Sequence, residues 1–184
     1  MHRHVRSLLI GGTLAVAGTL PVAAQTPQLM TDLMKDVGQV EQKMIALAQA
    51  IPADKYDWRP GTGVRSIGEV FKHVVSDNYL LPTMMGVAAD PSTGITSDYK
   101  TAMAFEARPM SRDTVVANLK RSFANLKQTM TSTTQDKLGQ SVSMFGQTLT
   151  GQQTWILTTT HLHEHLGQAI AYARSVGVVP PWSK

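Results

Sequence analysis

Residues 150–176 read TGQQTWILTTTHLHEHLGQAIAYARSV, and no other segment says as much about the architecture of this chain. Thr150 and Gln153 have the spacing of a capping box, in which each side chain bonds the backbone N–H of the other residue. Apolar or small side chains then recur at helical intervals, at Leu162, Leu166, Ala169 and Ala173. Gly177 and the pair Pro180-Pro181 follow, so we expect the helix to end near Val176. The pattern predicts a long amphipathic helix whose apolar face must be covered by other helices.

Three further stretches show the same periodicity, so the sequence predicts four helices of bundle length. The first has apolar residues at intervals of three and four over residues 30–51. The second begins with a capping box formed by Ser66 and Glu69 and ends between residues 82 and 85. The third spans about residues 111–130, with Ser111 suited to cap its first turn.

The connections between these helices differ in length. Residues 53–64 form a turn-rich loop, and residues 131–149 include a Phe145-Gly146 turn that favours a short hairpin. Residues 88–110 contain several Pro and Gly residues and are longer than an ordinary connection between helices. We therefore predict an all-α protein, a four-helix bundle with a long loop between helices 2 and 3.

Composition excludes several classes of chemistry. The chain has 184 residues, of which 42% are hydrophobic and 16% charged, and this composition is typical of one globular domain. It has no cysteine, which excludes disulfides, thiolate nucleophiles, Fe–S clusters and cysteine zinc sites. Any thiol chemistry would need a thiol on the substrate.

The first 24 residues have the layout of a secretory signal peptide. Arg3 and Arg6 precede an apolar run over residues 8–20, and small residues precede a predicted cleavage after Ala24. The alternative is an uncleaved anchor, but this run is shorter than the ~20 residues that span a bilayer. We expect an exported chain, periplasmic or secreted, whose mature domain is residues 25–184 and has no stable membrane anchor.

Much of the positive charge of the chain belongs to this leader. The formal net charge is +4, and removing residues 1–24 takes away two arginines and no acidic residue. The mature chain has no cluster of Lys and Arg and no alternation of basic with aromatic residues, so we expect no nucleic-acid partner.

The histidines of the mature chain point to a metal site. At about 100° per residue, His161 and His165 lie about 40° apart on one helix, and Gln168 and Tyr172 lie within about 20° of His161. Two histidines at this spacing can chelate a divalent ion, and a third ligand from another helix would leave an open position. His73, on the second predicted helix, is suited to be that third ligand.

Acidic residues stand one turn on either side of His73. Glu69 and Asp77, at i−4 and i+4, could orient its imidazole, bind the metal or act as a base. Gln168 and Tyr172 share the histidine stripe, so we predict that they line a substrate pocket, although they could merely solvate the helix flank.

Other interpretations of the histidines remain open. A single histidine such as His73 is often a hydrogen-bonded packing residue, and a pair at i and i+4 arises by chance on exposed helices. His161, His163 and His165 would share one face of a strand, as in cupin-type sites, but the chain lacks the many strands that a barrel needs. The zinc-protease pattern H-E-x-x-H fails, because Gly167 stands where the second histidine belongs.

The sequence resembles the DinB superfamily. The resemblance rests on SIGEVFKH, residues 66–73, and HLHEHLGQ, residues 161–168, and it covers about residues 28–183. Residues 56–60, YDWRP, and 177–183, GVVPPWS, are similar to stretches that flank the site in that family. The resemblance implies an up-down-down-up bundle and a divalent metal held by His73, His161 and His165. Family members with known activity are transferases or isomerases that depend on a small thiol and work in the cytoplasm, which differs from the export expected here.

Three function classes follow. The first is a metal-dependent enzyme acting on a small molecule, as a hydrolase or a thiol-dependent transferase, with Zn, Ni or Fe as the ion and Asp77 as base or as a support for the ligands. The second is an exported protein that binds a metal or small ligand without turnover. The third is a structural bundle that oligomerises through its apolar faces, and a homodimer is one open form of assembly.

Overall fold

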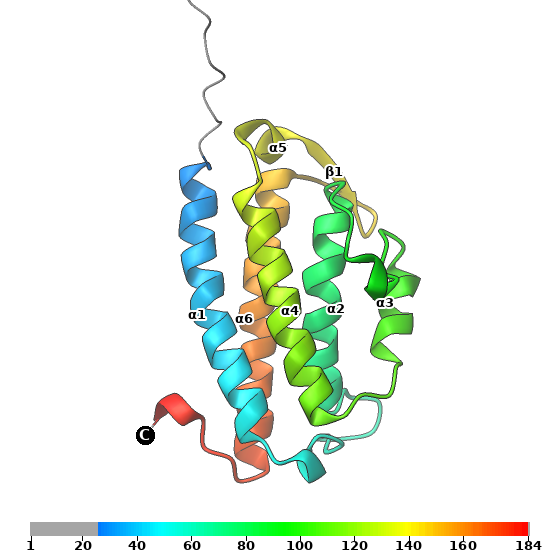
Figure 1. The fold of residues 1–184 in the computed structure, drawn as a ribbon, viewed down its shortest axis with the longest axis vertical. Helices are drawn as coiled ribbons and strands as arrows, with labels where there is room; N and C mark the ends of the chain where they lie inside the picture. The colour runs from blue at the N-terminus through cyan, green and yellow to red at the C-terminus, as the bar shows by residue number, and fades with distance from the viewer. Residues whose placement is uncertain (1–25, 184) are drawn as a thin grey trace, which may run out of the picture.

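The structure, a computed structural model, describes residues 26–183. The predicted signal peptide, residues 1–24, lies outside these residues. Four long helices form a bundle (Figure 1). They are α1 (Gln28–Ala50), α2 (Ile67–Met84), α4 (Arg112–Thr131) and α6 (Gly151–Ser175). Each of the four predicted helices is present, with ends close to those expected, and the prediction of an all-α bundle is confirmed.

The four helices have the up-down-down-up arrangement. In Figure 1, α1 and α6 run in one direction, and α2 and α4 run in the other. Each of the four packs against two others, because α1 and α2 both contact α4 and α6. Their apolar faces meet in one core that includes Val37, Phe71, Leu119 and Leu162, all of them buried. One buried polar contact joins α2 to α4, where the Asn78 amide donates to the Ser122 hydroxyl at 3.0 Å.

The long connection between α2 and α4 is partly helical. Because these helices run parallel, the chain must travel back along the bundle, about 27 Å for an 18-residue helix, before α4 can begin. It does so through the 3-10 turn η2 (Pro91–Thr93) and the short helix α3 (Tyr99–Glu106), which packs on the outer side of α2 (Figure 1). The prediction of a long loop here holds for its position and length, but it missed α3.

A hairpin stands between α4 and α6, as the Phe145-Gly146 turn predicts. Strand β1 (Ser141–Met144) pairs antiparallel with β2 (Gln147–Thr150), in a register that sets Val142 opposite Leu149. Phe145 and Gly146 both have positive φ angles, 49° and 78°, which suits a two-residue hairpin turn. The short helix α5 (Gln135–Gly139) precedes the hairpin.

Two 3-10 turns complete the fold. They are η1 (Ala53–Lys55), after α1, and η3 (Pro181–Ser183), after α6. Among the described residues, no helix combines the length and apolar character needed to cross a membrane.

Candidate metal centre

The structure brings together the three histidines that the sequence singles out. His161 and His165 lie on successive turns of α6, and His73 faces them from α2. The ring centroids are 4.3 Å apart for His161 and His165, 4.7 Å for His73 and His165, and 5.3 Å for His73 and His161. One nitrogen from each ring can be chosen so that all three lie within 4.8 Å of one another. The three residues thus form a group that could hold a metal ion.

His165 has one ring nitrogen bonded and the other unsatisfied. Its Nδ1 lies 2.9 Å from the Gln168 Oε1, and since an amide oxygen only accepts, Nδ1 carries the proton of this bond. The Gln168 amide in turn donates to the Tyr172 hydroxyl at 3.1 Å. The Nε2 atom is buried and has no hydrogen-bond partner among the described residues. This arrangement leaves a lone pair on Nε2 without a partner among the described residues.

Burial also keeps His165 in the form that binds metals. Loss of solvent is the largest influence and lowers the pKa of His165. The hydrogen bond to Gln168 opposes this change, and the charges that His161 and His73 carry when protonated lower the pKa further. A histidine must be neutral to donate its lone pair to a metal, so the depressed pKa favours ligation.

Asp77 bridges the two helices at the same point. Its Oδ2 lies 2.7 Å from Nε2 of His161 and 3.4 Å from Nε2 of His73. The carboxylate is buried, with 9% of the side chain exposed. The sequence placed Asp77 beside His73 by its spacing of four residues, and the structure adds the contact with His161.

A second carboxylate, which sequence reasoning missed, lies behind His73. Glu106, the last residue of α3, has its Oε1 2.8 Å from Nδ1 of His73 and accepts from the Ser76 hydroxyl at 2.7 Å. Burial by itself raises the pKa of Glu106. The hydrogen bonds from His73 and Ser76, the charge of His73 when protonated and the charge of Arg65 outweigh burial and hold the pKa below its usual value. His73, Asp77 and Glu106 form a second group that could hold a metal ion.

The predicted pocket residues form one edge of the cluster. Gln168 and Tyr172 are half-buried, and the ring of Trp58 meets Tyr172 edge to face at 5.5 Å. His161 has 24% of its side chain exposed, against 7% for His73. Of these two histidines, His161 is therefore the one that solvent reaches more easily.

Two other residues considered from the sequence lie away from the centre. Glu69 caps α2, accepting from the backbone N–H of Ser66 at 2.7 Å, and pairs with Arg59 at 3.2 Å. His163 is exposed and bonds Asp36 of α1 at 2.7 Å, as its place on another face of the helix predicts. The exposure and separate partner of His163 make it a suitable control for the three clustered histidines.

The residues present fit a divalent ion. The fit rests on the unsatisfied Nε2 of His165, because buried polar atoms in folded proteins are nearly always bonded. The rings of His73 and His161 belong to the same cluster, Asp77 Oδ2 lies beside both of them, and imidazole and carboxylate are ordinary zinc ligands.

Comparisons with known proteins agree with this fold. A family model described as the DinB superfamily matches residues 37–169. The structure is similar to the crystal structure of a DinB-like protein from Bacillus cereus, with a TM-score of 0.68 and 16% sequence identity, over 82% of this chain and 95% of that one. It is also similar to a DinB-like protein from Bacillus subtilis, with a TM-score of 0.61 and 18% identity, over 79% of this chain and 92% of that one. At such identities the two structures show likeness of fold alone, and no curated protein matches the sequence.

Proposed function

Since the chain belongs to the DinB superfamily, we propose that it is a metal-dependent enzyme whose divalent ion is held by His73, His161 and His165. The observation that supports this most directly is the buried Nε2 of His165, which has no partner among the described residues. When bound, such an ion acts as a Lewis acid, which polarises a carbonyl group and lowers the pKa of a coordinated water or thiol.

The neighbouring residues are placed to support hydrolysis or thiol-dependent transfer on a small molecule. Asp77 Oδ2, beside both Nε2 atoms, can accept a proton from a nucleophile at that point. The Gln168 amide and the Tyr172 hydroxyl, which are half-buried and linked by hydrogen bonds to His165, can orient a polar substrate. Because the chain has no cysteine, a transfer reaction would take its thiol from a cosubstrate.

The first test is the metal content of protein without a histidine tag. Elemental mass spectrometry of residues 25–184, after incubation with Zn²⁺ or Ni²⁺ and removal of free ion, should give about one ion per chain. The variant His161→Ala/His165→Ala should lose it, and His163→Ala should keep it, because His163 bonds Asp36 instead. Failure of the parent protein to retain either ion would refute the proposed site.

One observation favours a second candidate, a metal-binding protein without turnover. Asp77 Oδ2 stands close enough to two ligand nitrogens to complete the coordination itself, and closed sites with four protein ligands are typically structural. The visible spectrum of the Co²⁺-loaded protein separates the two functions. A shift on adding a small thiol such as mercaptoethanol indicates an open position and supports the enzyme, whereas an unchanged spectrum supports the closed site.

The predicted export is a further part of this proposal. Expression of the full chain in a bacterial host, followed by mass measurement, should give a mature protein that begins at Gln25. Retention of Met1 in the cell-associated protein would argue for an uncleaved leader.

A further inference from the structure

We propose that Glu106, at the end of α3, is a positioning residue that fixes the ring of His73 so that Nε2 faces His161 and His165. The inference rests on the proposed function and deepens it, because it assigns the connection between α2 and α4 a part in the metal centre. A histidine can bind a metal through either ring nitrogen, and a hydrogen bond to one nitrogen leaves the other for the ion.

The contacts around Nδ1 of His73 are short and sheltered. Glu106 Oε1 lies 2.8 Å from Nδ1, and only 7% of the His73 side chain and 16% of the Glu106 side chain are exposed. The Ser76 hydroxyl donates to the same Oε1 at 2.7 Å. These bonds hold the carboxylate in one place against the ring.

A third group competes for the same nitrogen. Arg65 Nη2 lies 3.2 Å from His73 Nδ1 and 3.6 Å from Glu106 Oε2. A guanidinium only donates and a carboxylate only accepts, so one ring nitrogen cannot satisfy both. The shorter distance and the ion pair between Arg65 and Glu106 assign the bond to Nδ1–H donating to Glu106.

This assignment determines what remains for the ion. With the proton held on Nδ1, the nitrogen left to bind is Nε2, which lies 3.4 Å from Asp77 Oδ2. A lone pair on Nε2 then lies beside a carboxylate oxygen, and a bound cation would offset the repulsion between these electron-rich atoms. Glu106 thereby favours the Nδ1–H tautomer of His73, as Gln168 does for His165.

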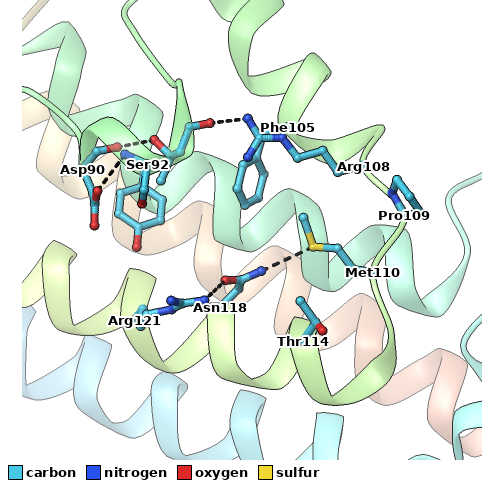
Figure 2. A pocket seen from close by; sticks show the side chains of 11 residues that line it. Asp90, Ser92, Phe105, Arg108, Pro109, Met110, Thr114, Asn118 and Arg121 are labelled. Atoms are coloured by element: carbon cyan, nitrogen blue, oxygen red, sulfur yellow. Dashed lines mark hydrogen bonds between the residues drawn. The ribbon is translucent and has the colours of Figure 1, made fainter.

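Glu106 can act in this way because α3 is fastened to the bundle. Phe105 is buried, and the Arg108 guanidinium lies over its ring at 4.9 Å. Arg108 Nη2 also donates to the Thr93 carbonyl at 2.7 Å. Figure 2 shows the side chains of Phe105 and Arg108 together at this pocket. Phe105 and Arg108 line a cavity of about 300 Å³, whereas the carboxylate of the intervening Glu106 contacts His73. The last turn of α3 is thus held by other contacts when Glu106 is replaced.

The experiment compares metal affinity in two matched variants. Glu106→Ala should weaken Zn²⁺ binding by about 10- to 100-fold, measured by competition with a chromogenic chelator. Glu164→Ala removes one negative charge from the exposed face of α6 beside His165 and should change affinity by less than about twofold, as expected for a screened surface charge. Equal losses in the two variants would mean that charge alone matters and would overturn the proposal.

A second readout needs no metal. Two-bond ¹⁵N–¹H spectra of the metal-free protein, at a pH where the rings are neutral, report which nitrogen of His73 is protonated. We expect Nδ1–H in the parent and in Glu106→Gln, which keeps an acceptor oxygen, and a loss of Nδ1–H in Glu106→Ala. An unchanged tautomer in Glu106→Ala would refute the positioning role even if the protein binds metal. Conversely, the expected tautomers in a protein that binds no metal would refute the proposed function alone.

Discussion

At the scale of the residue, the metal centre holds an atom that costs stability when no ion is bound. His165 is 6% exposed, and its Nε2 has no partner among the described residues. An unsatisfied buried polar atom costs about 1–3 kcal/mol. We therefore expect the free energy of unfolding of His165→Leu, measured by urea unfolding with EDTA present, to equal that of the parent or to exceed it by up to about 1 kcal/mol.

This expectation is opposite to that for most buried residues, whose replacement destabilises by 0.5–3 kcal/mol. The matched variant is Leu162→Ala, on the same helix and 1% exposed, which should lose about 2–5 kcal/mol through the cavity it creates. A loss above about 1 kcal/mol in His165→Leu would show that His165 is a packing residue.

The sequence identifies the nearest residues of the centre but not the more distant ones. His161 with His165, and His73 with Asp77, are each four residues apart, so helical periodicity alone puts each pair on one face. Glu106 is 33 residues from His73 and approaches it through the fold of the connecting segment. No spacing rule links residues across such a segment, and the sequence offered no signal for this contact.

At the scale of the element, the four long helices could be predicted because each repeats its apolar pattern over several turns. The helix α3 has eight residues, of which only Ala102 and Phe105 are buried. Its apolar residues include the exposed Tyr99 and Met103, so they do not mark one clear face, and the Pro and Gly residues nearby are typical of loops. Asp98 caps its first turn by accepting from the Lys100 N–H at 3.0 Å, and packing on α2 adds to this local signal.

The capping box of α2 carries a pH dependence that can be tested. The pKa of Glu69 is lowered chiefly by the hydrogen bond from the backbone N–H of Ser66, with Arg59 adding to it and burial opposing it. A carboxyl group with a depressed pKa stabilises the fold above its unfolded pKa, and this contribution is lost as the pH falls through the folded value. Glu69→Gln keeps a residue that can cap the helix but cannot ionise.

We expect the parent to be more stable than Glu69→Gln near neutral pH, with the difference shrinking as the solution is acidified through the pKa range of Glu69. Urea unfolding of both proteins across this range measures the difference. In Ser66→Ala, which removes the other half of the box, stability should fall by about 1 kcal/mol at neutral pH. If the difference in stability between the parent and Glu69→Gln did not change with pH, the role given to the charge of Glu69 would be contradicted.

At the scale of the whole molecule, the direction of the helices decides where the centre forms. Periodicity predicts four helices, but it does not say which of them run parallel. The resemblance to the family implied the up-down-down-up order, and the structure shows how the chain accommodates it, by returning from the end of α2 to the start of α4 through α3 (Figure 1). The same return path carries Glu106 to His73.

The centre also links parts of the chain that are far apart in sequence. His73 and His161 are separated by 88 positions, on helices that pack against each other in the core. An ion bound by both helices cannot remain bound once they separate, so its binding free energy adds to the stability of the entire bundle. An ion bound at this one site should therefore stabilise the whole bundle against unfolding.

Zn²⁺ at about 100 times its dissociation constant should stabilise the folded protein by about 2.7 kcal/mol, which for a chain of this size raises Tm by about 5 to 10 °C. The rise should appear equally by circular dichroism at 222 nm and by tryptophan fluorescence, because the bundle unfolds as one unit. His161→Ala/His165→Ala should show no rise, whereas His163→Ala should respond as the parent does, since His163 bonds Asp36 outside the centre. An equal rise in Tm in the double variant would mean that the stabilising ion binds elsewhere. The three clustered histidines would then have no part in the stabilisation by Zn²⁺.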